Sequence, residues 1–158
     1  MPDFGRRRVE IRNDCRGLAF GEASVRQVFR ILDAEGLFRP PAGDLSVAFV
    51  PLAQLRALHL RHLADDSETD VLSFPGNPGW SFAGEIVVAP AMAHRRCRHC
   101  GTSFPEELSL YLVHGYLHLG GLNDLGPGEG EKMRRAEEDC LQRLRQHRAL
   151  PKFLWRGK

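Results

Sequence analysis

Two histidines and an aspartate within eleven residues could hold a metal ion. The segment HGYLHLGGLND begins at His114, places His118 four residues later and ends at Asp124. Residues four apart on an α-helix lie on one face, so both imidazoles can reach one ion at about 2.0 to 2.1 Å. Gly120 and Gly121 let the chain leave the helix and fold back, which brings the aspartate within reach as a third ligand.

Three protein ligands leave one tetrahedral position for water, which is typical of a catalytic zinc site. The His-x-x-x-His spacing alone is short and common, and two such histidines can simply pack or face solvent. The longer pattern with a turn glycine and a third ligand is more specific. We therefore predict that His114, His118 and Asp124 bind one Zn²⁺ and form the catalytic centre.

The residue after the first histidine argues against a peptidase. A metzincin carries glutamate there as its general base, whereas this chain has Gly115. Without that carboxylate, peptide hydrolysis by the usual zincin route has no proton acceptor. A zincin-like metallopeptidase is therefore the weaker interpretation of the same ligand spacing.

Apolar periodicity indicates which elements position these residues. Alternating patterns predict strands near 9–11, 45–49, 69–74 and 85–89, with the last two forming a neighbouring pair joined by the connection PGNPGWSFAG. Helical spacing predicts helices near 25–35, 52–62, 90–100, 105–119 and 131–147, with Ser24 capping the first and Gly36 ending it. The order βαβαββααα predicts an α+β fold, or a three-layer α/β sandwich. We expect a small mixed four-stranded sheet, about five helices and a zincin-like metal helix.

Length and composition suit one globular domain. The chain has 158 residues, of which 42% are hydrophobic and 27% are charged, so we expect a single domain over 1–158. The longest apolar runs, such as 47–52, are too short to span a bilayer, and the basic N-terminus has no apolar run behind it. We expect a cytoplasmic protein with no membrane partner. Its four cysteines are then expected to be free thiols.

Three clusters of arginine stand out against a net charge of only +2. They could touch phosphates if they converge in space, or they could be solvated faces of separate elements. The clusters are Arg6, Arg7 and Arg8; Arg95, Arg96 and Arg98; and Arg143, Arg145 and Arg148.

The metal-ligand segment resembles a motif of a known family. HGYLHLGGLND is similar to the His-Gly-x-Leu-His-Leu-x-Gly-x-Asp-His motif of the YbeY family, bacterial endoribonucleases of ribosomal-RNA maturation. Upstream, ETDVLSFP at 68–75 resembles that family's Pro-Thr-Asp-Val-Leu-Ser-Phe-Pro segment, and AGEIVVA resembles the Gly-Asp-Ile strand after it. The order and spacing of these blocks extend the likeness over most of the sequence.

The resemblance implies a zinc-dependent endoribonuclease specific for single strands. Its partners would be single-stranded or ribosomal RNA and the small ribosomal subunit, in rRNA maturation and ribosome quality control. The family's metal ligands carry over to His114, His118 and Asp124. The alternative is a ribosome-assembly factor that binds RNA and keeps a vestigial metal site. The sequence predicts no oligomeric state.

The chain departs from the family pattern at several positions. The family has histidine where Asp124 stands and aspartate where Asn123 stands. A carboxylate is a legitimate zinc ligand, so the site can survive this change. Leu63 aligns with a family arginine, for which Arg61 is a possible substitute, and this loss of a cation favours the assembly factor modestly. Glu68 replaces a proline.

Other candidate residues lie outside the motif. The resemblance implies that the TDVLSFP strand lines a substrate groove, where Thr69, Asp70 and Ser73 could offer polar contacts, unless they only cap a buried strand. His59 and His62 are expected to be packed or exposed. The last candidate is CRHC at 97–100, a lone Cys-x-x-Cys beside His94 and His99, which lacks the second pair of a structural zinc site.

Overall fold

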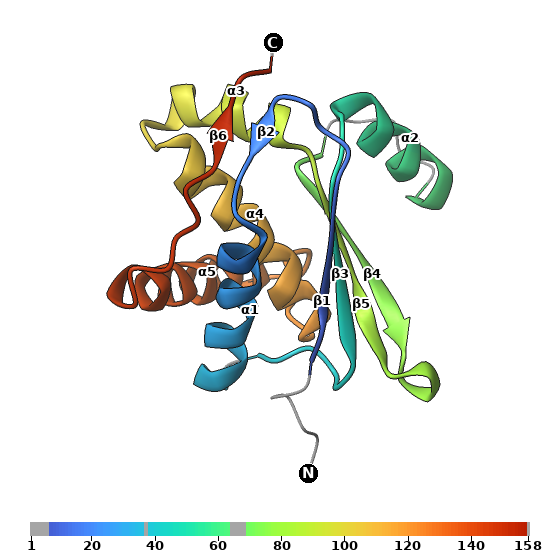
Figure 1. Ribbon diagram of the computed structural model, residues 1–158. Coiled ribbons are helices and arrows are strands. Elements are labelled where there is room, and N and C mark those ends of the chain that lie inside the picture. Colours follow the sequence, from blue (N-terminus) through green and yellow to red (C-terminus); the bar gives the residue numbers. More distant parts are fainter. Residues whose placement is uncertain (1–6, 37, 64–68, 158) are drawn as a thin grey trace.

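A mixed β-sheet with helices on both faces forms the centre of the fold (Figure 1). The computed structural model describes residues 7–36, 38–63 and 69–157. The strands of the sheet, in spatial order, are β1 (Val9–Asn13), β3 (Asp44–Phe49), β5 (Phe82–Val88) and β4 (Val71–Asn77). β1 and β5 both pair parallel with β3, and β4 pairs antiparallel with β5. The predicted α+β class, mixed sheet and neighbouring β4–β5 pair are confirmed.

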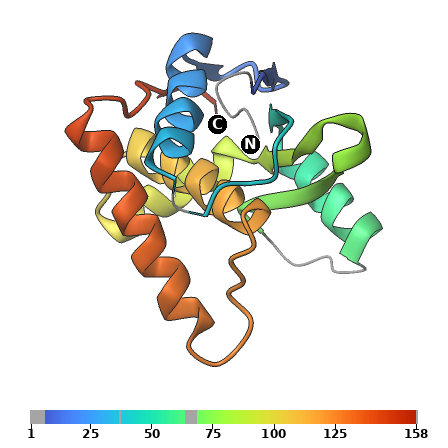
Figure 2. The ribbon, with the colours of Figure 1, turned by 90° about the horizontal axis from the view of Figure 1, so that it is seen from below.

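The helices lie on both faces of this sheet. Their bounds are α1 (Glu22–Glu35), α2 (Leu52–Leu63), α3 (Pro90–Cys100), α4 (Phe104–Leu119) and α5 (Glu129–Gln146). Figure 1 shows α1, α4 and α5 on one face and α2 on the other. Figure 2 shows α4 between the sheet and α5. These helices match the five that the periodicity predicts, with ends that differ by a few residues.

Helix α4 is the central helix of the fold. A helix covered on most sides carries apolar residues nearly all round, unlike an amphipathic surface helix. Its N-terminus is capped by Ser103, whose hydroxyl accepts a hydrogen bond from the backbone N–H of Glu106 at 3.3 Å. Five of its hydrophobic side chains are completely buried: Leu108, Leu112, Val113, Tyr116 and Leu117. The helix that carries both candidate ligand histidines is therefore fixed by the core itself.

Some local predictions were wrong. The N-cap of α1 is Gly21 rather than Ser24, whose hydroxyl donates to the carbonyl of Gly21 at 2.6 Å. The β4–β5 hairpin is longer than expected, since pairing continues to Asn77 opposite Phe82 and only the turn at Pro78–Trp80 (η2) separates the strands. β4 is an edge strand, so a proline within it removes no ladder hydrogen bond. The short pair β2 (Leu18–Ala19) and β6 (Leu154–Trp155) was not predicted.

A buried ion pair ties α1 to the start of β1. Arg7 Nε donates to Asp33 Oδ2 at 2.8 Å, and the two side chains are 2% and 7% exposed. Tyr116 of α4 donates its hydroxyl to the other oxygen of Asp33 at 2.8 Å. The arginine also donates to the carbonyls of Pro40, Pro41 and Gly43. This network, in which buried charges are paired and hydrogen-bonded, fixes α1, α4 and β1 against one another.

Candidate metal centre

Helix α4 presents both predicted histidines near its C-terminal end. His114 and His118 lie one turn apart, and their ring centroids are 4.6 Å from each other with the rings at 78°. The chain then turns sharply: the N–H of Leu122 donates to the carbonyl of Leu117, and Gly121 adopts φ 102°. That left-handed backbone favours glycine, as the sequence predicted for this position.

The returning loop brings Asp124 beside the two imidazoles. Its Oδ2 lies 3.8 Å from Nε2 of His114, and its Oδ1 lies 3.7 Å from Nε2 of His118. Each of the three side chains offers one ligand atom, and these atoms all lie within 4.8 Å of one another. Ligands at about 2.1 Å from a tetrahedral ion stand roughly 3.4 Å apart, so small side-chain rotations suffice. Two imidazole nitrogens and a carboxylate oxygen could therefore hold a metal ion here.

A fourth residue, Glu137 of α5, orients one of these imidazoles. Its Oε2 lies 3.1 Å from Nδ1 of His114. A carboxylate accepts the Nδ1 proton, and this leaves the lone pair on Nε2, the nitrogen that faces Asp124. Glu137 was not predicted. It is 23 residues from its partner, and nothing in the spacing of the α5 glutamates distinguishes it from its neighbours.

The surroundings shift the pKa values of the two histidines in opposite directions. Burial, the largest influence on His114, disfavours its charged form, but the hydrogen bond and charge of Glu137, together with Asp70 and Asp124, raise its pKa above the ordinary value. Burial and then the neighbouring His114 lower the pKa of His118, and the opposing effect of Asp124 is smaller. Neutral His118 is therefore a ready metal ligand, whereas His114 must lose a proton that Glu137 favours.

The three candidate ligands line a cleft of about 710 Å³. One wall is β4 with its preceding residues, another is α2, and the third is the end of α4 with the loop after it. The strand segment TDVLSFP lies along this cleft, in agreement with the prediction. The lining residues are His59, His62, Thr69, Asp70, Val71, Leu72, Ser73, Phe74, Pro75, His114, His118, Leu119, Asp124 and Leu125.

The three polar residues of this strand already have partners. Ser73 donates its hydroxyl to the carbonyl of Gly115 at 3.2 Å, which joins β4 to α4. The carboxylate of Asp70 accepts from Arg96 of α3 at 2.6 Å. Thr69 donates to the carbonyl of Val71 at 3.4 Å. These side chains therefore brace the wall of the cleft, and Asp70 in addition keeps an exposed fraction of 30%.

Two further histidines enter the cleft from α2. His59 is buried, whereas His62 is exposed and packs edge-on against Phe74, with ring centroids 5.0 Å apart. Packing and exposure were the expectation for these two histidines, but the cleft that they share with His114 and His118 was not predicted. The suggested substitute Arg61 is not among the lining residues. Glu68 lies outside the described residues.

The absence of glutamate after the first histidine has a packing reason. A Cβ on Gly115 would come within 2.5 Å of Cγ2 of Ile86 and 3.2 Å of Oγ of Ser73. The position therefore faces the sheet at close approach rather than the cleft. A side chain there would push α4 away from β4 and β5, so the general base of a zincin has no place at this position.

The described arginines of the three clusters and the cysteines lie outside this cleft. At least one arginine of each basic cluster forms an ion pair: Arg7 with Asp33, Arg96 with Asp70, and Arg143 with Glu35. The first cluster lies directly before β1, the second lies on α3, and the third lies at the end of α5 and just after it. Arg6 lies outside the described residues. The four cysteines carry free thiols. Cys97 is buried and donates to the carbonyl of His94, whereas Cys100 is exposed.

This fold and cleft define a small α+β protein with two helical histidines and a loop carboxylate at a candidate metal centre. The chain belongs to the family described as Endoribonuclease YbeY, whose model matches residues 18–145. The relative from Parafrankia sp. is 32% identical in an alignment of 147 residues that covers 84% of this chain and 91% of the relative. The relative from Thermobifida fusca is 32% identical over 143 residues, with the same two shares. Both carry the name Endoribonuclease YbeY.

Other relatives are longer than the matched region. This chain matches 56% of the length of the Corynebacterium kroppenstedtii relative, at 35% identity, and 57% of the Frankia casuarinae relative, at 34% identity. A similar fold occurs in the solution structure of TM1509 from Thermotoga maritima, with a TM-score of 0.55 and 22% identity over 89% of this chain and 94% of that one. Among the described helices, none combines the length and apolar character needed to cross a bilayer.

Proposed function

We propose that this protein is a zinc-dependent endoribonuclease that cuts single-stranded RNA. The observation that carries the proposal is the convergence of His114, His118 and Asp124 in a cleft beside β4. Two helical imidazoles and one carboxylate match the ligand chemistry of catalytic zinc sites. The family, and the name Endoribonuclease YbeY that its relatives carry, support RNA as the substrate. We place the activity in small-subunit rRNA maturation and ribosome quality control, in the cytoplasm, with one domain carrying the whole function.

The residues of the chain have distinct tasks in this mechanism. His114 and His118 would hold the ion through imidazole nitrogens and Asp124 through a carboxylate oxygen, while Glu137 keeps His114 in the tautomer with a free Nε2. Zinc bound there would supply an activated water at neutral pH and stabilise charge on a phosphoryl oxygen.

The walls of the cleft would hold the RNA. The hydrogen bond between Ser73 and Gly115 fixes the distance from β4 to the ligand helix. Across the cleft, the exposed His62 would contact a phosphate or base of the strand. The exposed apolar side chain of Leu125, which is 89% accessible, would pack against an unstacked base. A cleft that contacts splayed bases favours single strands over duplex RNA.

One observation favours a second candidate, an RNA-binding assembly factor with a vestigial metal site. Among the described residues that line the cleft, none is lysine or arginine. A nuclease gains from a cation beside the reacting phosphate. The peptidase hypothesis has less support, because Gly115, the position that would carry the general base, is packed against Ile86.

Metal content and cleavage test the proposal together. Purified protein should carry close to one zinc per chain and should cut a labelled single-stranded RNA, but neither the matching duplex nor an unfolded protein. A chelator should stop cleavage. Zinc bound in one equivalent without any RNA cleavage would favour the assembly factor, and cleavage of the protein substrate alone would favour the peptidase.

Alanine variants of the three candidate ligands test the contribution of each side chain to zinc binding. His114→Ala and His118→Ala should lose zinc and cleavage while the fold persists, and Asp124→Ala should weaken zinc binding because two protein ligands remain. His99→Ala, an exposed histidine on α3, is the matched control and should behave as wild type. If Asp124→Ala binds zinc as tightly as wild type, Asp124 is a turn residue and not a ligand.

A further inference from the structure

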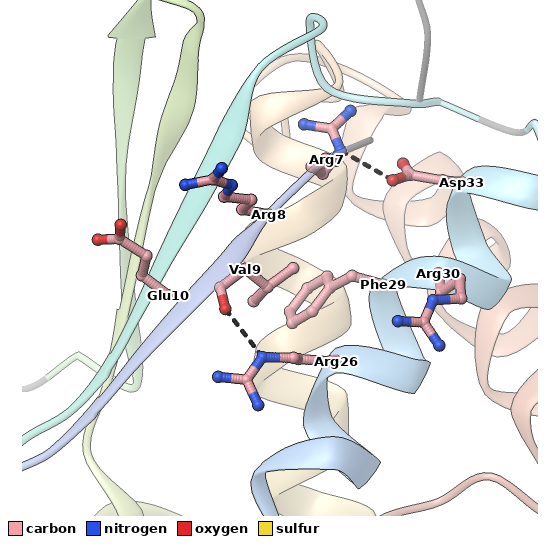
Figure 3. A pocket seen from close by; sticks show the side chains of 8 residues that line it. All are labelled: Arg7, Arg8, Val9, Glu10, Arg26, Phe29, Arg30 and Asp33. Atoms are coloured by element: carbon pink, nitrogen blue, oxygen red, sulfur yellow. Dashed lines mark hydrogen bonds and ion pairs between the residues drawn. The ribbon is translucent and has the colours of Figure 1, made fainter. Parts of the chain in front are cut away.

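A second concave surface lies at the opposite edge of the sheet from the metal cleft. It is a pocket of about 400 Å³ between the edge strand β1 and helix α1. The cleft borders β4, and β3 and β5 separate these two edges, so the sheet alone sets them roughly 14 Å apart. Figure 3 shows the lining residues, namely Arg7, Arg8, Val9, Glu10, Arg26, Phe29, Arg30 and Asp33.

Two of these residues form the inner wall. Arg7 and Asp33 are both buried and satisfy each other's charge, with further hydrogen bonds to Tyr116 and to three backbone carbonyls. Figure 3 shows this pair beside the pocket. The pair therefore adds rigidity to the pocket but no free charge.

The other three arginines of the lining, Arg8, Arg26 and Arg30, are exposed or half-buried. Among the described lining residues, the only other charged one is Glu10, so positive charge is in excess. Arg26 donates through Nε to the carbonyl of Val9 at 3.2 Å, which fixes its guanidinium over the strand, and it pairs with the exposed Glu22 on its own helix. An exposed pair of this kind screens charge weakly. Within the described part of the chain, the guanidinium groups of Arg8 and Arg30 have no hydrogen-bond or ion-pair partner.

The placement of Arg26 and Arg30 is unfavourable without a ligand. They lie four apart on α1, where like charges destabilise a helix by about 0.2 to 0.5 kcal/mol. Arg8, directly before β1, adds a third positive charge to the lining, and Figure 3 shows it on the same side of the chain as Glu10. An anion bound beside Arg26 and Arg30 would turn their repulsion into attraction, and the planar guanidinium fork suits the oxygens of a phosphate.

We propose that this pocket is a second phosphate-binding site, which holds a phosphodiester of the RNA strand away from the metal cleft. The identity of the ligand rests on the proposed function, and charge complementarity between three arginines and a polyanion supports it. A strand held at both edges of the sheet would gain affinity by intramolecular attachment at the second site. The site also supplies the cations that the described lining of the cleft lacks.

The test measures RNA binding rather than cleavage. Fluorescence anisotropy would follow a labelled single-stranded RNA bound to the full chain in chelator, so the result does not depend on whether the cleft cuts RNA. R8Q/R30Q should bind about tenfold more weakly, because charge-assisted contacts are lost. The slope of log K against log salt should fall by about 1.4, or about 0.7 for each lost phosphate contact on a single strand.

Matched controls make the outcome decisive. R16Q removes one exposed arginine outside this pocket and should bind RNA as wild type does. R8K/R30K keeps the charge and should retain most of the affinity. Equal affinity and salt slope for R8Q/R30Q and wild type would overturn the proposal, as would an equal loss in R16Q. Binding of anionic phospholipid vesicles in place of RNA would also overturn it. Thermal melting checks that each variant is folded.

Discussion

Nδ1 of His114 lies 3.1 Å from Oε2 of Glu137, so α5 orients an imidazole that α4 presents to the candidate metal centre. The carboxylate is largely buried, with 14% of its side chain exposed, and the histidine is 21% exposed. A hydrogen bond shielded in this way holds the ring more firmly than one in water. The contact joins the two longest helices of the fold at the point where the chemistry is proposed.

Removing this carboxylate should weaken the metal site without emptying it. Partners that orient a metal-ligating histidine typically contribute 10 to 100-fold to metal affinity. We expect Glu137→Ala to lower zinc affinity by about that factor, measured by competition with a chromophoric chelator. Glu138→Ala is the control, because that exposed glutamate pairs with Arg145 instead. Unchanged zinc affinity in Glu137→Ala would show that the hydrogen bond does not support the site.

The two histidines should titrate in a defined order in the metal-free protein. The pKa of His114 is raised and that of His118 is lowered, so NMR should show His114 protonating at the higher pH. Protonated His114 then stabilises the fold. This contribution is fully present below the unfolded pKa of about 6.5 and is lost as pH rises through the higher folded pKa.

Glu137→Ala also tests why His114 should protonate at a higher pH than His118. Glu137→Ala should lower the pKa of His114, and the difference in thermal stability from wild type should be largest at low pH. Zinc binding should follow the opposite pH dependence, because the ion needs neutral imidazoles and competes with protons as pH falls. A titration in which His118 protonates first would contradict the electrostatic account.

Packing at Gly115 should be sensitive to a single methyl group. A Cβ at this position would come within 2.5 Å of Ile86 Cγ2. Overpacking of this kind typically costs about 1 to 3 kcal/mol, so Gly115→Ala should lower the free energy of unfolding by that amount in denaturant titration. Gly130→Ala in α5 meets nothing closer than 3.7 Å and should leave stability unchanged or slightly raised. Equal stability of the two variants would show that α4 can shift away from the sheet to accommodate the methyl group.

The exposed histidine of α2 should affect catalysis and not metal content. We expect His62→Ala to reduce kcat/KM for single-stranded RNA by about tenfold through loss of a substrate contact, with zinc stoichiometry unchanged. His62→Arg should retain cleavage, because the longer cation can still reach a phosphate. His99→Ala serves again as the surface control. Full activity of His62→Ala would remove α2 from the substrate-contacting surface.

The sequence by itself determined most of the elements, because their signals are local. Period-two and helical patterns specified the four main strands and five helices within a few residues. The order of these elements was enough to indicate the mixed sheet. Ser24 was misplaced as a cap because glycine is also accepted at the N-cap, at a cost of only a few tenths of a kcal/mol. The pair of β2 and β6 escaped prediction, since two-residue strands have no periodicity and their partners are far apart in sequence.

The same division holds at the candidate metal centre. The three candidate ligands were found from sequence because helical spacing and a glycine turn fix where they point, whatever surrounds them. Glu137, His59 and His62 reach the site from other helices, and the pairing of Arg7 with Asp33 joins residues 26 apart. Only the tertiary structure decided these contacts, because they depend on how α2, α4 and α5 pack around the sheet, and no local pattern encodes which polar side chains meet across that packing.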